Sequence, residues 1–217
     1  EVWIPDCYSL EDKLYIERIY SIPARFVPWI WEHISLDTYC VNNKLSKWNQ
    51  FENPESQLIV LESNNTNTSN CTLPLCIIAE ITEKTPLPWI VGNGEILKKN
   101  KYFNGNVVNN LFSGKDVSGN FIGRIPVPEL RKFRSILLAH QRWRSMKHLL
   151  LDALWLDIPM IHNCLIIQEG LKAAGGYFYP TNEISTAVNQ YADLTKDLYT
   201  SNGYFSKEAL FQRKVYC

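Results

Sequence analysis

The segment AHQRWRSMKHLLLDALWLDIPMIHNCLIIQEGLKAAGGYFYP, residues 139–180, decides the fold predicted for this chain. Residues 135–139 are an apolar run that predicts a strand, and residues 149–156 are an apolar stretch that predicts a buried helix. Pro159 ends this helix, because proline cannot continue the hydrogen-bond ladder of a helix. A second strand begins at Met160, and the segment closes with a loop and a short strand. This alternation of strands and helices is typical of a parallel α/β sheet.

Polar side chains follow both strands of this segment. His140 and Gln141 come directly after the first strand, and His162 and Asn163 end the second. Ligands of open α/β sheets bind beyond the carboxyl ends of the strands, so we expect these four residues to share one rim. Asp152 is the one acid of the apolar helix between them, where an unpartnered carboxylate would be costly. The sequence therefore predicts a binding site at this edge.

Each of these polar residues also has a purely structural interpretation. Histidine and asparagine at strand ends can cap the next turn through side-chain hydrogen bonds. Asp152 could pair with Lys147 or His148 of its own helix, or face solvent. Aromatic residues in and around the segment are interpreted as packing: Tyr177, Phe178, Tyr179, Trp3, Trp29, Trp31 and Trp89.

A phosphate-binding element is predicted upstream. Four consecutive apolar residues at 58–61 indicate a parallel strand buried on both faces, and a helix is expected at about 71–83. The loop between them is polar and contains Asn64, Ser69 and Asn70, of which the last two are good N-cap residues. The first amides of a helix and its dipole favour bound anions. The loop and the helix start are therefore candidate contacts to a phosphate group.

The rest of the chain extends and frames this sheet. We expect strands at 89–91 and 121–122, a short helix at 128–134, an N-terminal strand and amphipathic helix within 1–20, an aromatic strand at 25–31, irregular structure at 33–56, and C-terminal helices at 182–198 and 205–215. The fold class is thus α/β, a doubly wound Rossmann-like parallel sheet with C-terminal helices. We assign 1–217 to a single domain in which 1–45 is an N-terminal crossover or extension and 182–217 holds the C-terminal helices.

Composition excludes several classes of protein. Lys plus Arg and Asp plus Glu both number 22 in 217 residues, so no overall charge recruits nucleic acid or membrane. The sequence has no apolar run near the roughly 20 residues of a transmembrane helix. Dinucleotide and P-loop glycine motifs, a G-x-S-x-G elbow, D-x-D and metal-ligand spacings are all missing, so we expect neither cofactor nor metal. Six cysteines without a C-x-x-C pair favour reduced thiols and a cytoplasmic location, although three N-x-S/T sequons at Asn64, Asn67 and Asn70 argue weakly against it.

Five groups of residues, in this order, carry a resemblance. They are EVWIP at 1–5, PARFVPWIWE at 23–32, LESNN with CTLPLCIIAE between 61 and 80, FIGR at 121–124, and HQ, LDALW, HN and GYFYP between 140 and 180. Over nearly its whole length the chain resembles the nucleotide-sugar domain of a poorly characterised family of GT-B-fold glycosyltransferases. More distantly it is similar to retaining GT-B transferases. The resemblance implies a nucleotide-sugar donor, a glycan or other acceptor, and C-terminal helices that pack back across a domain cleft.

The resemblance also implies roles for individual residues. Asp152 would accept hydrogen bonds from the ribose hydroxyls, and Glu169 would meet the ribose or the sugar. The loop after Gly123, with Arg124, would approach the nucleotide base. His140, Gln141, His162 and Asn163 would lie near the donor sugar or its phosphates.

Two arginines of the central segment remain open to two interpretations. Arg142 and Arg144 stand where the family pattern is closer to H-Q-W-E-N, and the upstream loop has Ser69 or Asn70 where the family has a lysine. The two guanidinium groups would either supply the charge that neutralises a diphosphate or form a solvated basic face.

The expected function is transfer of a sugar from a nucleotide-sugar to an acceptor without a metal. A GT-B enzyme has two Rossmann-like domains, and the match begins at the crossover into the second. The acceptor site would then come from another part of a longer enzyme or from a separate subunit of a split enzyme. The alternative is a non-catalytic nucleotide-binding or protein-interaction module. No nucleic-acid partner and no transmembrane segment are expected.

Overall fold

A computed structural model describes residues 1–5, 10–28, 30–45, 57–61, 71–132, 134–141, 147–198, 200 and 202–217. Among these residues, no helix combines the length and the apolar character needed to cross a bilayer.

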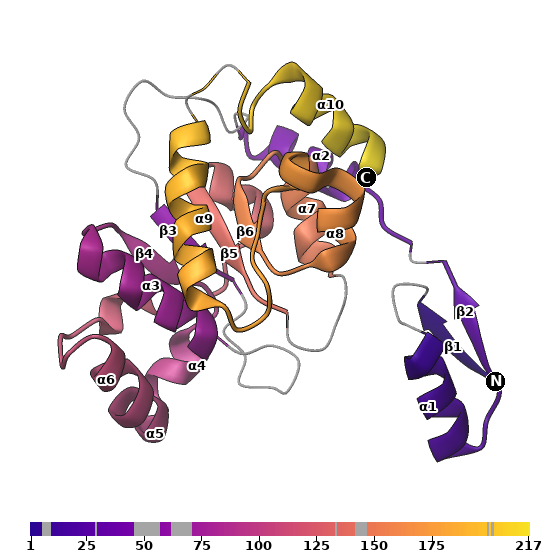
Figure 1. Ribbon diagram of the computed structural model, residues 1–217, viewed down its shortest axis with the longest axis horizontal. Coiled ribbons are helices and arrows are strands. Elements are labelled where there is room, and N and C mark those ends of the chain that lie inside the picture. The colour runs from indigo at the N-terminus through magenta and orange to yellow at the C-terminus, as the bar shows by residue number, and fades with distance from the viewer. Residues whose placement is uncertain are drawn as a thin grey trace.

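The centre of the molecule is a parallel sheet of five strands in the order β4-β3-β5-β6-β7 (Figure 1). Its register pairs Leu58 with Ile136, and Leu137 with Met160. Every residue of β5 is buried, as expected of a parallel strand that is covered on both faces. The strands are β3 (Gln57–Val60), β4 (Trp89–Val91), β5 (Ser135–Ala139), β6 (Met160–His162) and β7 (Tyr177–Phe178).

Helices cover both faces of the sheet, which confirms the doubly wound α/β prediction. Leu58, Val60 and Leu138 pack with α3 and α9 on one face, whereas the alternate residues Ile59 and Leu137 pack with α2, α7, α8 and α10 on the other. Burying a side chain of this size contributes roughly 1.5–3 kcal/mol, so the two layers hold the fold together. The helices are α2 (Ile34–Asn42), α3 (Thr72–Lys84), α7 (His148–Trp155), α8 (Leu165–Leu171), α9 (Ile184–Asp197) and α10 (Lys207–Tyr216).

The strand order defines a switch point between β3 and β5. From β3 the chain crosses through α3 to β4 on one side. From β5 it crosses through α7 to β6 on the other side and on the opposite face. At such a point the two loops diverge and open a crevice beyond the carboxyl ends of the strands, which is where doubly wound proteins bind ligands.

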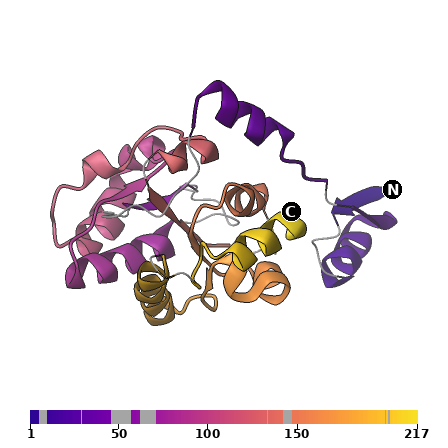
Figure 2. The same cartoon turned by 90° about the horizontal axis from the view of Figure 1, so that it is seen from above.

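A small β-α-β unit stands apart from this body in both views (Figures 1 and 2). It consists of β1 (Val2–Pro5), α1 (Leu10–Tyr20) and β2 (Ala24–Val27), with the two strands parallel. None of the residues of α1 is buried, and Tyr15 and Ile19 are 65% and 58% exposed. Parallel sheets are normally covered on both faces, so this unit presents an unusual amount of apolar surface.

Several regions differ from expectation. Residues 33–56 were expected to be irregular, yet α2 forms at their start, where Tyr39 donates to Glu129 and Arg131 donates to the Cys40 thiol. The loop expected after β6 contains α8. The strand expected at 121–122 is a single bridge between Phe121 and Val91. The polar stretch 92–120 contains the short helices α4 (Glu95–Lys98), α5 (Lys101–Phe103) and α6 (Asn109–Leu111).

Candidate functional site

The carboxyl end of β5, beside the switch point of the sheet, carries a buried amide that has no partner among the described residues. Gln141 follows β5, is only 4% exposed, and neither its side-chain nitrogen nor its oxygen has a hydrogen-bond partner in the part of the chain that the structure describes. Leaving a buried polar group unpaired costs about 1–3 kcal/mol. A polar partner is therefore expected at this position.

The backbone of Gln141 is held by Asn163. The Gln141 amide donates to Asn163 Oδ1 at 2.7 Å, and Asn163 Nδ2 donates back to the Gln141 carbonyl at 2.7 Å. Asn163 Nδ2 also lies 3.3 Å from the Thr181 hydroxyl. The Asn163 side chain thus ties the ends of β5 and β6 together, which is the capping interpretation weighed from the sequence.

The two histidines lie on opposite faces of the sheet. His162 pairs in register with Ala139, and side chains alternate along a strand, so His140 projects to the other face. There its Nδ1 lies 3.0 Å from the Tyr179 hydroxyl, which also donates to the Ala139 carbonyl at 3.2 Å. His140 and His162 share the carboxyl edge of the sheet but do not converge on one reacting atom.

His162 is fully buried and neutral. Its Nδ1 accepts a hydrogen bond from the Cys164 amide at 3.2 Å, so the ring proton is on Nε2. That Nε2 has no partner among the described residues. Burial lowers the pKa of His162 to about 4, because the charged ring would be poorly solvated.

Gly123 lies at the neighbouring carboxyl end of β4. The Asn93 amide donates to the Gly123 carbonyl at 2.9 Å, and a Cβ at Gly123 would lie 3.6 Å from the Glu95 carboxylate. Arg124 is exposed beside it, and Glu169 is exposed on α8. The predicted residues that the structure describes therefore come from several elements: the segment after β4, the ends of β5 and β6, and helices α7 and α8. Asn64, Ser69, Asn70, Arg142 and Arg144 lie outside the described residues.

Asp152 on α7 accepts a hydrogen bond that the sequence did not indicate. The Trp31 indole donates from its Nε1 to Asp152 Oδ1 at 2.8 Å, across a separation of 121 residues. Burial raises the pKa of Asp152, and the Trp31 hydrogen bond and the nearby His148 oppose this shift. The expectation that Trp31 serves only in packing is therefore incomplete. The only signal for it is the cluster of aromatic residues between prolines at 23–32.

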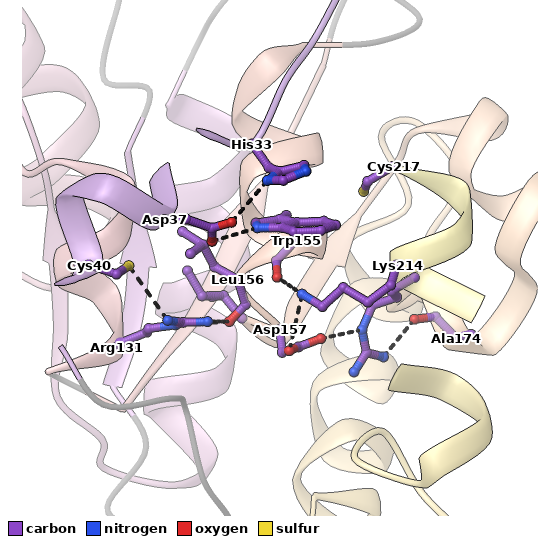
Figure 3. A network of polar contacts seen from close by, with 12 residues as sticks. His33, Asp37, Cys40, Arg131, Trp155, Leu156, Asp157, Ala174, Lys214 and Cys217 are labelled. Atoms are coloured by element: carbon purple, nitrogen blue, oxygen red, sulfur yellow. Dashed lines mark hydrogen bonds and ion pairs between the residues drawn. The ribbon is translucent and has the colours of Figure 1, made fainter. Parts of the chain in front are cut away.

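The Trp155 ring contacts the linker between β2 and α2, which contains Trp31 and His33, and so joins it to the body (Figure 3). Trp155 Nε1 donates to Asp37 at 2.9 Å, while the His33 ring stacks on Trp155 with centroids 4.0 Å apart. Partial burial acts to raise the pKa of Asp37, but the hydrogen bonds from Trp155 and His33 outweigh it, so the pKa of this carboxyl is lowered. Lys214 lies 4.2 Å from the Trp155 ring centre and donates to the Trp155 carbonyl.

The carboxyl end of α7 is surrounded by basic groups. Arg131 donates from Nε and Nη2 to the Leu156 carbonyl at 3.1 and 3.0 Å (Figure 3). Lys214 lies 3.4 Å from Asp157, the residue that follows. Cations stabilise the negative end of the helix dipole, so these contacts fix the helix that carries Asp152.

Other hollows and donor sets lie away from this edge. A hollow of about 760 Å³ opens at the amino end of β4, beside Trp89, Glu80 and Lys115. Within the described ranges, no three His, Cys, Asp or Glu side chains converge in a manner suited to a metal ion. The five described cysteines (Cys40, Cys71, Cys76, Cys164 and Cys217) carry free thiols.

Solved structures share this architecture. Sucrose-phosphate synthase from Thermosynechococcus elongatus matches with a TM-score of 0.60 at 9% identity, covering 98% of this chain and 53% of that one. The pneumococcal O-GlcNAc transferase GtfA, solved in complex with UDP and GlcNAc, matches with a TM-score of 0.55 at 12% identity, covering 99% of this chain and 42% of that one. The chain thus spans about half the length of the structures it matches. The similarity confirms the predicted GT-B, Rossmann-like fold.

Sequence comparison identifies the family. No curated protein matches the chain. A family model described as "Protein of unknown function (DUF2827)" matches residues 1–202, and the chain therefore belongs to this family.

Proposed function

We propose that the chain is the donor-binding half of a glycosyltransferase, which transfers a sugar from a nucleotide-sugar to an acceptor. The observation that carries this proposal is the buried amide of Gln141, which has no partner among the described residues and lies at the switch point of a doubly wound sheet. A nucleotide-sugar has phosphate oxygens that accept and hydroxyls that both donate and accept. Either group would satisfy the Gln141 amide.

Around the Gln141 amide we assign a position to each part of the donor. The diphosphate would lie at the start of α3, with Asn64, Ser69 and Asn70, and with the cations Arg142 and Arg144. Charge placed in advance at the leaving diphosphate would stabilise it without a metal.

The remaining parts of the donor would lie on either side of the diphosphate. The base would approach the Gly123–Arg124 segment, and the ribose hydroxyls would bind Asp152. Glu169 would meet the ribose or the sugar. His140, His162 and Asn163 would shape the edge on which the sugar rests.

The acceptor would bind outside the five-stranded sheet. The exposed apolar side chains of the β1-α1-β2 unit favour contact with a further α/β layer, because α1 covers one face of the two-stranded sheet, where Ile4 and Ala24 are buried, while Trp3 is 71% exposed. We propose that this layer, from another part of a longer enzyme or from a partner subunit, carries the acceptor site. The same surface also fits the second candidate function, a non-catalytic protein-interaction module.

Calorimetric titration tests the donor site. UDP, GDP, dTDP and their sugars are added to the chain with and without EDTA, starting with UDP because the GtfA structure contains it. We expect saturable binding of one nucleotide, unchanged by EDTA and about tenfold weaker in Gln141→Ala. Gln212→Ala, which alters an exposed glutamine on α10, is the matched control. A folded protein that binds none of these nucleotides would refute the donor site and leave the interaction module.

A further inference from the structure

We propose that Trp31 is a positioning residue of the donor site, which orients the Asp152 carboxylate from the segment between β2 and α2 and leaves its second oxygen available to the ribose hydroxyls. This inference rests on the proposed function, because it assumes that Asp152 meets the ribose. It assigns a role in the donor site to a side chain outside the sheet and its helices.

The first support is the state of the Asp152 carboxylate. Its Oδ1 accepts the Trp31 indole N–H at 2.8 Å, and within the described residues no further hydrogen bond reaches this side chain. A carboxylate can accept about four hydrogen bonds. A group that is half-buried on an apolar helix therefore keeps unused acceptor capacity, which suits the two neighbouring hydroxyls of a ribose.

The second support is that the indole itself is held in place. The Trp31 ring packs edge-on against Trp155 with centroids 6.1 Å apart, and it lies 6.4 Å from the His33 ring. His33 stacks on Trp155 and pairs with Asp37 at 2.9 Å. The position of the indole N–H is thus determined by contacts among the linker, α2 and α7.

The consequence is a physical link between the N-terminal unit and the donor site. Trp31 lies four residues beyond the end of β2 at Val27, so a change in the direction of the linker would move the indole and, with it, the carboxylate. Trp31→Phe keeps most of the ring and removes the N–H. We expect this variant to bind the nucleotide about tenfold more weakly, since a hydrogen bond to a charged group is lost.

The pH dependence of binding separates positioning from packing. The ionised form of Asp152 accepts ribose hydroxyls, so binding is lost as the pH falls through the pKa of this group. The Trp31 hydrogen bond lowers that pKa, hence Trp31→Phe moves the acid limb of the binding curve to higher pH. A variant that only disturbs packing leaves the limb in place.

Two other titratable groups face Asp152. His148 lies on its own helix, and Cys217 directly follows α10, where burial raises the pKa of the thiol to about 11. The thiol stays neutral over the acid range. His148→Gln is made in both the wild-type and Trp31→Phe backgrounds, so that any charge on this imidazole is the same in the two proteins compared.

The experiment compares nucleotide affinity in four proteins: wild type, Trp31→Phe, Asp152→Ala and the double variant. We expect the two single losses to be strongly non-additive, because both remove the same interaction. Trp3→Phe, which alters a tryptophan that is 71% exposed on β1, is the matched control. Wild-type affinity and an unmoved acid limb in Trp31→Phe, or tighter binding, would overturn the inference.

The outcomes also distinguish this inference from the proposed function. If Asp152→Ala binds normally, the acid has no donor role. If the wild type binds no nucleotide, the donor site itself is refuted.

Should Trp31→Phe fail to fold, the indole N–H resonances of the folded wild type provide a second test. The chemical shift of one of them must change with pH as a carboxyl group ionises, and it must also change when nucleotide is added. The pH dependence must be absent in Asp152→Ala. If no indole responds in this way, the inference fails.

Discussion

Arg213 on α10 and Asp157 after α7 form a buried ion pair. The Arg213 side chain is fully buried, and its Nε lies 3.2 Å from Asp157 Oδ1. The same guanidinium donates to the carbonyls of Ala174 and Tyr204 and lies 4.1 Å from the centre of the Tyr204 ring. The donors of a buried cation need partners, and here each guanidinium nitrogen has at least one, from three segments. The pair therefore fixes the C-terminal helix to the sheet.

Removing one partner of this pair should be costly. We expect Arg213→Met to lower the free energy of unfolding by about 3–5 kcal/mol, because an uncompensated carboxylate stays buried. Lys214, 3.4 Å from Asp157, offsets part of this loss. Urea denaturation provides the measurement. Arg25→Met, which breaks the exposed pair with Glu1, should cost less than about 1 kcal/mol; equal losses in the two variants would contradict the assignment.

The Asn163 clip between β5 and β6 can be tested by a change of one atom. Asn163→Asp replaces the donating Nδ2 by an oxygen that faces the Gln141 carbonyl, so we expect a loss of about 1–3 kcal/mol at neutral pH. A protonated carboxyl can donate again. The folded-state pKa of the new group should therefore be raised, and the loss should shrink as the pH falls through it. Thermal unfolding at several pH values measures this, and a loss that does not depend on pH would count against the clip.

His162 makes a defined contribution to acid sensitivity. Its pKa is lowered to about 4 in the folded protein from an ordinary value of 6.5, so the unfolded chain binds more protons between these values. Stability should accordingly fall as the pH drops from about 6.5 toward 4, by at most about 3 kcal/mol from this group. His162→Gln removes the titration. The difference in unfolding free energy between wild type and variant should depend on pH in this window, and a constant difference would show that the ring is not buried as a neutral group.

Gly176 permits the backbone conformation that precedes β7. Its φ is +116°, and a Cβ there would lie 2.7 Å from the Met160 carbonyl oxygen. We expect Gly176→Ala to destabilise the protein by about 1–3 kcal/mol, measured by denaturant unfolding. Gly105→Ala is the control, because a Cβ at that helical position meets nothing within 4 Å. A loss of similar size in the control would refute the steric explanation.

The order and type of the elements β5, α7 and β6 could be predicted because local hydrophobic patterns in the sequence indicate them. The apolar runs that became β5, α7 and β6 are bounded by polar residues and a proline, so their order and type are readable. Helix α2 was missed because its stability comes from distant partners, through the bonds from Tyr39 to Glu129 and from Arg131 to Cys40. Such contacts leave no periodic signal in the sequence.

The sequence predicted that polar residues would gather at the ends of β5 and β6, but not how their side chains are arranged there. Strand ends place His140 and His162 at one edge, yet their opposite faces follow from the register of β5 and β6, which the sequence does not encode locally. The bond from Trp31 to Asp152 joins residues 121 positions apart, and only the fold brings them together.

The bidentate contact between Asn163 and Gln141 has a consequence for recognition. Because both backbone groups of Gln141 are bonded to Asn163, which directly follows β6, folding has already ordered the main chain that presents its amide. A ligand arriving at the crevice would need to immobilise only the rotamers of this side chain, at about 0.5–1.5 kcal/mol. The backbone entropy of this residue is thus lost during folding rather than during association, which lowers the entropic cost of binding.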